Sequence, residues 1–121
     1  MPLRIPFVED HTDTRHVLSR LLRRFHYTVA AAPDYQTALT MLNESTFDVL
    51  LSDLALPDGD RCDLVVHAKS KQPLVAIALT ALGTMKNEAR GFSCGFDHYF
   101  VKPLDFRQLR AVLDRILAHG C

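Results

Sequence analysis

Four apolar segments of this chain each end at a side chain that can take part in chemistry. In chain order, Leu3–Val8 is followed by Glu9 and Asp10, Phe47–Ser52 by Asp53, Leu74–Leu79 by Thr80, and His98–Val101 by Lys102. If these segments are parallel strands, their carboxyl ends share one edge of a sheet, and ligands bind in the crevice outside that edge. The residues would then form one pocket of three carboxylates, a hydroxyl and an ammonium. Such a pocket suits a divalent cation together with a phosphoryl group.

The acidic residues of this pocket need a cation or a proton among them. Two unit charges about 4 Å apart repel by roughly 4 kcal/mol at an effective dielectric constant near 20. An all-oxygen site with room for water favours Mg²⁺, which takes one or two carboxylates and keeps several waters. Taken singly, Glu9 and Asp10 are typical of a solvated loop and Asp53 of a turn. Placed together at the ends of separate strands, they favour a metal site.

The hydroxyl and the ammonium have simpler interpretations as well. Thr80 can donate a hydrogen bond to a phosphoryl oxygen, although a threonine that caps a turn explains it almost as well. Lys102 could be one more surface lysine. However, Pro103 holds its backbone extended at the end of a strand, so its charge could neutralise an added phosphoryl group.

Strand-like and helical patterns alternate along the whole chain, which predicts an α/β fold with a doubly wound parallel sheet. Five helices separate and follow the five strands. Thr12 is the expected N-cap of the first helix, the second opens near Asp34, and the third follows a turn at 56–59. A fourth, capped by Thr84, is weakened by an interior glycine, and the last begins at Asp105. The predicted strands are Leu3–Val8, Tyr27–Ala31, Phe47–Ser52, Leu74–Leu79 and His98–Val101.

Composition limits the class of protein. The 121 residues suffice for one domain, residues 1–121, and the 14 basic and 14 acidic residues give no net charge that would favour nucleic acid or an anionic membrane. The apolar stretches have the length of strands, so no membrane segment is expected. The amino terminus lacks the apolar run of a secretory signal. Three cysteines without a C-x-x-C pair fit a reducing cytoplasm, which is the expected location.

Four motifs resemble those of the receiver domain of two-component response regulators. They are Phe7-Val8-Glu9-Asp10-His11, Leu51-Ser52-Asp53 through Gly59, Ala78-Leu79-Thr80-Ala81 and Tyr99-Phe100-Val101-Lys102-Pro103. The resemblance covers essentially the whole chain, and its opening motif is most similar to receivers fused to hybrid sensor histidine kinases. It implies a flavodoxin-like five-stranded sheet in the order 2-1-3-4-5.

The resemblance also implies a mechanism. Asp53 is the expected phosphoacceptor, which takes its phosphoryl group from a histidine kinase or a histidine phosphotransfer domain and forms an aspartyl phosphate. Glu9, Asp10, Asp53 and the backbone carbonyl of Ala55 are the expected Mg²⁺ ligands, with Glu9 acting mostly through a water. The expected chemistry is self-catalysed phosphotransfer and dephosphorylation, not kinase activity of this segment alone.

Two further roles follow from the resemblance. Lys102 and Thr80 would contact the phosphoryl oxygens. As Thr80 moves, Tyr99 would turn inward and alter the surface of the fourth helix, fifth strand and fifth helix, which a downstream protein partner reads. The first helix is implied as the docking surface for the donor, with Arg20 and Arg23 outside its apolar stripe.

Some alternatives stay open and others are disfavoured. Dinucleotide and flavin modules want a glycine-rich first turn, and phosphatases of the haloacid dehalogenase type want a second aspartate at position 55, which is alanine. The remaining rival is a receiver-shaped interaction module that works without phosphorylation. The chain is either a stand-alone regulator or a piece of a hybrid kinase, and the opening motif favours the second. Pro6 within the first strand is expected to shorten or distort it.

Overall fold

Five parallel strands form one sheet in the computed structural model, which describes residues 3–53, 61–80, 95–101 and 104–119. The strand order is β2-β1-β3-β4-β5, as the resemblance implied. Most strands begin one or two residues later than the sequence predicted, and β5 has the predicted bounds. The strands are β1 (Arg4–Val8), β2 (Thr28–Ala32), β3 (Val49–Asp53), β4 (Val75–Thr80) and β5 (His98–Val101).

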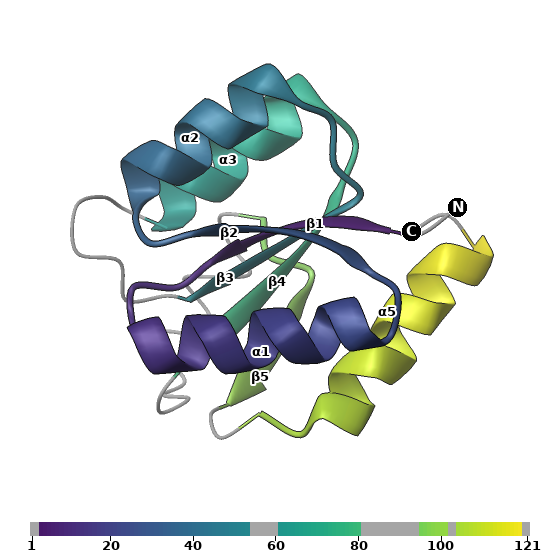
Figure 1. Cartoon of the computed structure of the whole chain (residues 1–121). Helices are drawn as coiled ribbons and strands as arrows, with labels where there is room; N and C mark the ends of the chain where they lie inside the picture. The colour runs from purple at the N-terminus through teal and green to yellow at the C-terminus, as the bar shows by residue number, and fades with distance from the viewer. Residues whose placement is uncertain (1–2, 54–60, 81–94, 102–103, 120–121) are drawn as a thin grey trace.

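Helices cover both faces of the sheet (Figure 1). They are α1 (Thr12–Arg24), α2 (Tyr35–Glu44), α3 (Arg61–Lys71) and α5 (Phe106–His119). In Figure 1, α1 and α5 lie on one side of the strands, and α2 and α3 lie on the other. The described residues thus contain four helices, whereas the sequence predicted five. The predicted fourth helix falls within 81–94, outside the described residues.

Each face of the sheet has its own apolar core. Phe7, Leu51 and Ile77 belong to the core beneath α1 and α5, and Val8, Leu50 and Ala78 to the core beneath α2 and α3. Successive strand residues point to opposite faces, so a strand covered on both sides must be apolar along its length. Every residue of β3 is buried, including Ser52 and Asp53. The continuous apolar run before Asp53 therefore reflects a central strand.

The caps of the helices confirm one prediction and correct another. Asp34 caps α2, and its Oδ1 accepts a hydrogen bond of 2.8 Å from the Thr37 amide. The prediction of Thr12 as the cap of α1 is wrong by one residue, because His11 is the cap and Thr12 is the first helical residue. The His11 Nδ1 accepts from the Thr14 amide at 3.4 Å, so the imidazole does what a serine or aspartate oxygen usually does.

Pro6 interrupts the pairing of β1 with only one of its neighbours. All five residues of β1 pair with β2, but the pairing with β3 is limited to Phe7 and Val8. The Leu3 carbonyl bonds to β2, and the Arg4 carbonyl accepts from Asp48 at the start of β3. Because alternate residues of a strand face the same neighbour, the missing N–H of Pro6 lies on the β3 side. β1 is thus one residue shorter than predicted, and its paired residues with β3 lie after the proline, with one backbone hydrogen bond before it.

Candidate functional site

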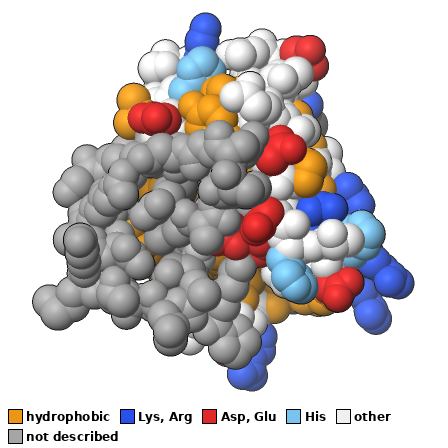
Figure 2. All heavy atoms as spheres, turned by 90° about the vertical axis from the view of Figure 1, so that its left-hand side faces the viewer, with side chains coloured by type: hydrophobic (Ala, Val, Ile, Leu, Met, Phe, Trp, Pro, Cys, Tyr) orange, Lys and Arg blue, Asp and Glu red, His pale blue; other side chains and the backbone are white. Residues whose placement is uncertain are grey.

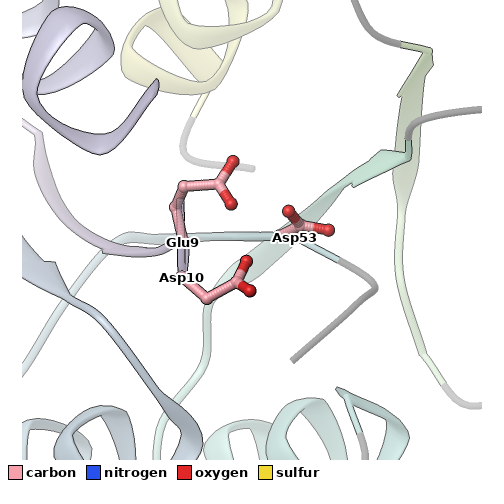
Figure 3. A group of neighbouring side chains, drawn as sticks. All are labelled: Glu9, Asp10 and Asp53. Carbon is pink, nitrogen blue, oxygen red and sulfur yellow. The ribbon is translucent and has the colours of Figure 1, made fainter. Parts of the chain in front are cut away.

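The three acidic residues that the sequence singled out lie together at the carboxyl edge of the sheet. Glu9 and Asp10 directly follow β1, and Asp53 is the last residue of β3, the neighbouring strand. One carboxylate oxygen from each lies within 4.8 Å of the others. Figure 3 shows the three side chains pointing into a common space. The adjacency of β1 and β3 in the sheet brings together residues more than forty positions apart.

Burial makes this cluster different from an ordinary acidic surface. Glu9 is 0% exposed and Asp53 is 5% exposed, whereas Asp10 is exposed. A buried carboxylate loses hydration that only hydrogen bonds or a positive charge can replace. Figure 2 looks onto this edge of the sheet and shows acidic side chains gathered near the centre of the view. The arrangement can bind a hard cation through oxygen ligands and can present a carboxylate oxygen as a nucleophile.

Backbone hydrogen bonds hold the loop that carries the acid pair. The Glu9 amide donates to the Ala32 carbonyl of β2 at 3.0 Å, and the His11 amide donates to Glu9 Oε2 at 3.3 Å. The Ser52 hydroxyl donates to the Asp53 carbonyl at 2.9 Å in a buried position. These contacts restrict the movement of the Glu9–His11 loop and of the Asp53 backbone.

Sequence reasoning missed one residue of this site. This residue is Arg15 of α1, whose Nη1 donates to the carbonyls of Glu9 at 3.0 Å and Asp10 at 3.4 Å. Its spacing of five and six residues from the acids was the available signal, because one turn of helix can return a long side chain to the preceding loop. Arg23 is likewise engaged, through a 3.0 Å hydrogen bond to the Val29 carbonyl.

The other expected site residues are placed only in part. Thr80 ends β4, next to β3, and pairs in register with Val101, the last residue of β5. Its side chain is outside the described part of the structure. Lys102 follows Val101 in the sequence, and both Lys102 and Ala55 lie outside the described residues.

Tyr99 lies on β5 and is half-buried against the core beneath α2 and α3. Its ring meets Phe96 edge-on, with 6.2 Å between the ring centroids. The expected inward turn of Tyr99 would therefore start from a ring that already packs along one side. The predicted fourth helix, which should form part of the same surface, lies outside the described residues.

A parallel sheet in the order β2-β1-β3-β4-β5 with carboxylates clustered at its carboxyl edge defines a flavodoxin-like α/β protein with a candidate metal site. The profile of the response regulator receiver domain matches residues 5–114, and the chain belongs to this family. It is thus a receiver domain of two-component signalling. No helix among the described ranges has the length and apolar character needed to span a membrane.

Individual relatives agree with this assignment. The chain is 33% identical over 116 residues to the two-component response regulator PhoP of Pseudomonas aeruginosa, and the match covers 95% of this chain and 52% of PhoP. The phosphate regulon transcriptional regulatory protein PhoB of Escherichia coli is 32% identical over 123 residues, with 96% of this chain and 54% of PhoB covered. The chain therefore spans about half the length of these relatives, and 26% of the transcriptional regulatory protein ZraR of Escherichia coli.

A solved structure supports the fold. The receiver domain of the sensor histidine kinase PA1611 from Pseudomonas aeruginosa superimposes with a TM-score of 0.86 at 24% identity, covering 95% of this chain and 97% of that one. In that protein a magnesium ion is coordinated in the active site cleft.

Proposed function

We propose that Asp53 accepts a phosphoryl group from a phosphohistidine of a histidine kinase or a histidine phosphotransfer domain. The observation that carries the proposal is the convergence of Glu9, Asp10 and Asp53 at one edge of the sheet. A carboxylate oxygen of Asp53 attacks phosphorus, an O–P bond forms as the P–N bond breaks, and the electron pair leaves with the imidazole nitrogen. The product is an aspartyl phosphate on this chain.

The acidic cluster fits Mg²⁺. Ligands on opposite sides of one Mg²⁺ are about 4.2 Å apart, twice the metal–oxygen distance, and the three carboxylate oxygens here lie within 4.8 Å. A small closure, or a water between Glu9 and the ion, brings them into coordination. We assign Asp10 and Asp53 as direct ligands, together with the carbonyl of Ala55, and Glu9 as a ligand through water. When bound, Mg²⁺ neutralises the charge that develops on the phosphoryl oxygens.

Two further residues complete the proposed site. Lys102 would pair with the phosphoryl oxygens as a compact positive charge, and Thr80 would donate one hydroxyl hydrogen bond. The position of β4 beside β3, and of β5 beside β4, supports these roles, because Thr80 and Val101 end their strands at the same edge as Asp53. Little covalent chemistry remains for the protein, so positioning and charge neutralisation dominate the rate.

The output of the domain follows from the same contacts. We expect Thr80 to move toward an added phosphoryl group and Tyr99 to turn into the space it leaves. This would change the surface formed by the fourth helix expected within 81–94, by β5 and by α5, which a downstream protein partner reads. No direct contact of this domain with nucleic acid is part of the proposal.

The surface beside α1 is the proposed docking site for the phosphoryl donor. A largely apolar cavity of about 410 Å³ lies between α1 and the start of α5, with Val17, Leu21, Leu104 and Phe106 among its lining residues. Val17 is 66% exposed. Exposed apolar surface on a helix that also carries the charged Arg20 suits an amphipathic helix of a donor bundle.

The domain context is also a proposal. The sequence Val8-Glu9-Asp10-His11 favours attachment to a hybrid sensor histidine kinase, whereas PhoP and PhoB are regulators of about twice this length. In either case, residues 1–121 would act as one receiver domain.

Intact mass measurement after incubation with a small acyl phosphate and Mg²⁺ tests the function. We expect the wild-type chain to gain the mass of one phosphoryl group, and Asp53→Asn or the addition of a chelator to abolish the gain. Asp48→Asn, which changes the aspartate just before the start of β3, is the control and should still be labelled. An unlabelled wild-type chain that is folded would favour the phosphorylation-independent interaction module.

A further inference from the structure

Arg15 bonds three consecutive carbonyls of the loop that carries the acid pair. Its guanidinium Nη1 donates to the Glu9 carbonyl at 3.0 Å and to the Asp10 carbonyl at 3.4 Å. Its backbone amide donates to the His11 carbonyl at 2.9 Å, as part of the first turn of α1. One residue of the helix therefore fixes the direction of three successive peptide groups.

The direction of these peptide groups affects where the carboxylates can point. A carbonyl oxygen is itself a good ligand for a hard cation, so an unrestrained loop could turn its carbonyls toward the metal in place of its side chains. Here the Glu9 and Asp10 carbonyls are turned to Arg15, while both carboxylates point toward Asp53 (Figure 3). The Glu9 amide, bonded to Ala32 of β2, holds the same loop from the other side.

We propose that Arg15 is a positioning residue of the metal site, which holds the Glu9–His11 loop so that the acidic side chains face Asp53. This inference rests on the proposed function, because it assumes that the cluster binds Mg²⁺. Partners of metal ligands that fix ligand orientation typically change metal affinity about 10–100-fold when they are removed. Arginine suits the task because its guanidinium stays charged and offers several donors in a fixed plane.

The sign of the effect separates positioning from simple electrostatics. A positive side chain near a cation site repels the cation, so removing its charge alone would strengthen Mg²⁺ binding. Removing an anchor of the loop would instead weaken binding, because the carboxylates would no longer be held in place. Arg15→Ala therefore gives opposite results under the two explanations.

Calorimetric titration of Mg²⁺ into the full chain provides the test, with wild type, Arg15→Ala, Arg15→Lys and Arg24→Ala compared. Arg24 lies in the last turn of the same helix and serves as the charge-matched control. We expect Arg15→Ala to weaken binding about 10–100-fold, Arg15→Lys to recover part of the loss, and Arg24→Ala to bind like wild type. Arg15→Ala that binds within twofold of wild type, or more tightly, overturns the inference.

Two controls keep the result interpretable. Thermal unfolding shows whether Arg15→Ala is folded at the titration temperature. If Arg15→Ala is unfolded there, Arg15→Lys becomes the tested variant. Hydrogen exchange of metal-free protein should be faster at residues 9–14 in the tested variant than in Arg24→Ala, and equal exchange counts against the anchoring role. If wild type itself binds no Mg²⁺, the proposed function fails together with the inference. Normal binding by wild type and Arg15→Ala overturns the inference alone.

Discussion

Glu9 and Asp53 give the metal-free protein two carboxylates that water barely reaches, beside the exposed Asp10. Their burial follows from the positions of β1 and β3 in the middle of the sheet, where the neighbouring strands shield the carboxyl ends of both. Three carboxylates held this close also repel one another. The site is thus prepared for a cation at some expense to the stability of the fold.

We predict that Asp53→Asn stabilises the metal-free protein. Removing one of three clustered charges should raise the free energy of unfolding by about 1–2 kcal/mol. This is a fraction of the roughly 4 kcal/mol by which two like charges 4 Å apart repel each other at an effective dielectric constant near 20. Urea unfolding in a chelator measures this difference. Mg²⁺ at a hundred times its dissociation constant should add about 2.7 kcal/mol to wild type and less to Asp53→Asn. Equal unfolding midpoints of the two proteins without metal would contradict the prediction.

The sequence predicted the acidic cluster because each acid follows an apolar strand, and the parallel sheet places such residues at one edge. It did not predict the contacts of Arg15 or the cap at His11. Both depend on how a side chain folds back onto its own backbone, which residue periodicity does not encode. Thr12 has the residue type preferred for a cap, but the chain enters the helix one residue earlier.

Among the elements, α2 offers the clearest link between sequence and stability. Asp34 caps it as predicted, and hydrogen bonds from the side chain and then the backbone N–H of Thr37 lower the pKa of the Asp34 carboxyl. A carboxyl with a lowered pKa in the folded state stabilises the fold above its unfolded-state pKa. That contribution is lost as the pH falls through the folded-state pKa.

Asp34→Ala should therefore destabilise the protein by about 1 kcal/mol at neutral pH, and Asp34→Asn by much less, because asparagine is an equally good cap. The difference between wild type and Asp34→Ala should shrink below about pH 4, where the carboxyl gains a proton. Unfolding by urea at pH 7 and at successively lower pH measures both effects. A difference between wild type and Asp34→Ala that does not change with pH would show that the charge of the cap is unimportant.

Element order was also predictable, and exact boundaries were less so. The alternation of apolar runs with helical patterns identified all five strands, and the family resemblance supplied their order. Strand starts were predicted too early at Leu3, Tyr27 and Phe47, because these residues are buried without belonging to the ladder. Burial and strand pairing are different properties, and the sequence pattern reports the first.

At the scale of the molecule, Asp97 joins three elements of the half that carries the proposed switch. It precedes β5, and its Oδ2 accepts from Lys69 Nζ of α3 at 2.8 Å and from the Ala76 amide of β4 at 2.9 Å. The Asp97 amide in turn donates to the Ala76 carbonyl at 2.7 Å. These contacts fix the start of β5, the strand that bears Tyr99, to α3 and to β4.

We expect Asp97→Ala to cost about 2 kcal/mol of unfolding free energy, because the half-buried Ala76 amide loses a charged acceptor. Lys69→Met should cost less than about 1 kcal/mol, since the ion pair it removes is partly exposed to solvent. Urea unfolding of the two variants side by side measures the contrast. Equal losses would assign the stabilisation to the ion pair and not to the amide.

Pro6 leaves a short break in the hydrogen bonding between β1 and β3. The ladder between β1 and β3 is confined to Phe7 and Val8, the residues just before the acidic loop. On the other side of the proline, the Asp48 amide donates to the Arg4 carbonyl at 2.9 Å and the Arg4 amide donates to Asp48 Oδ2 at 2.8 Å, so both ends of this break are held. Local opening of the sheet should therefore stay confined to the residues around Pro6, between these two bonded ends, and the acidic loop beyond Val8 should keep its place while it occurs.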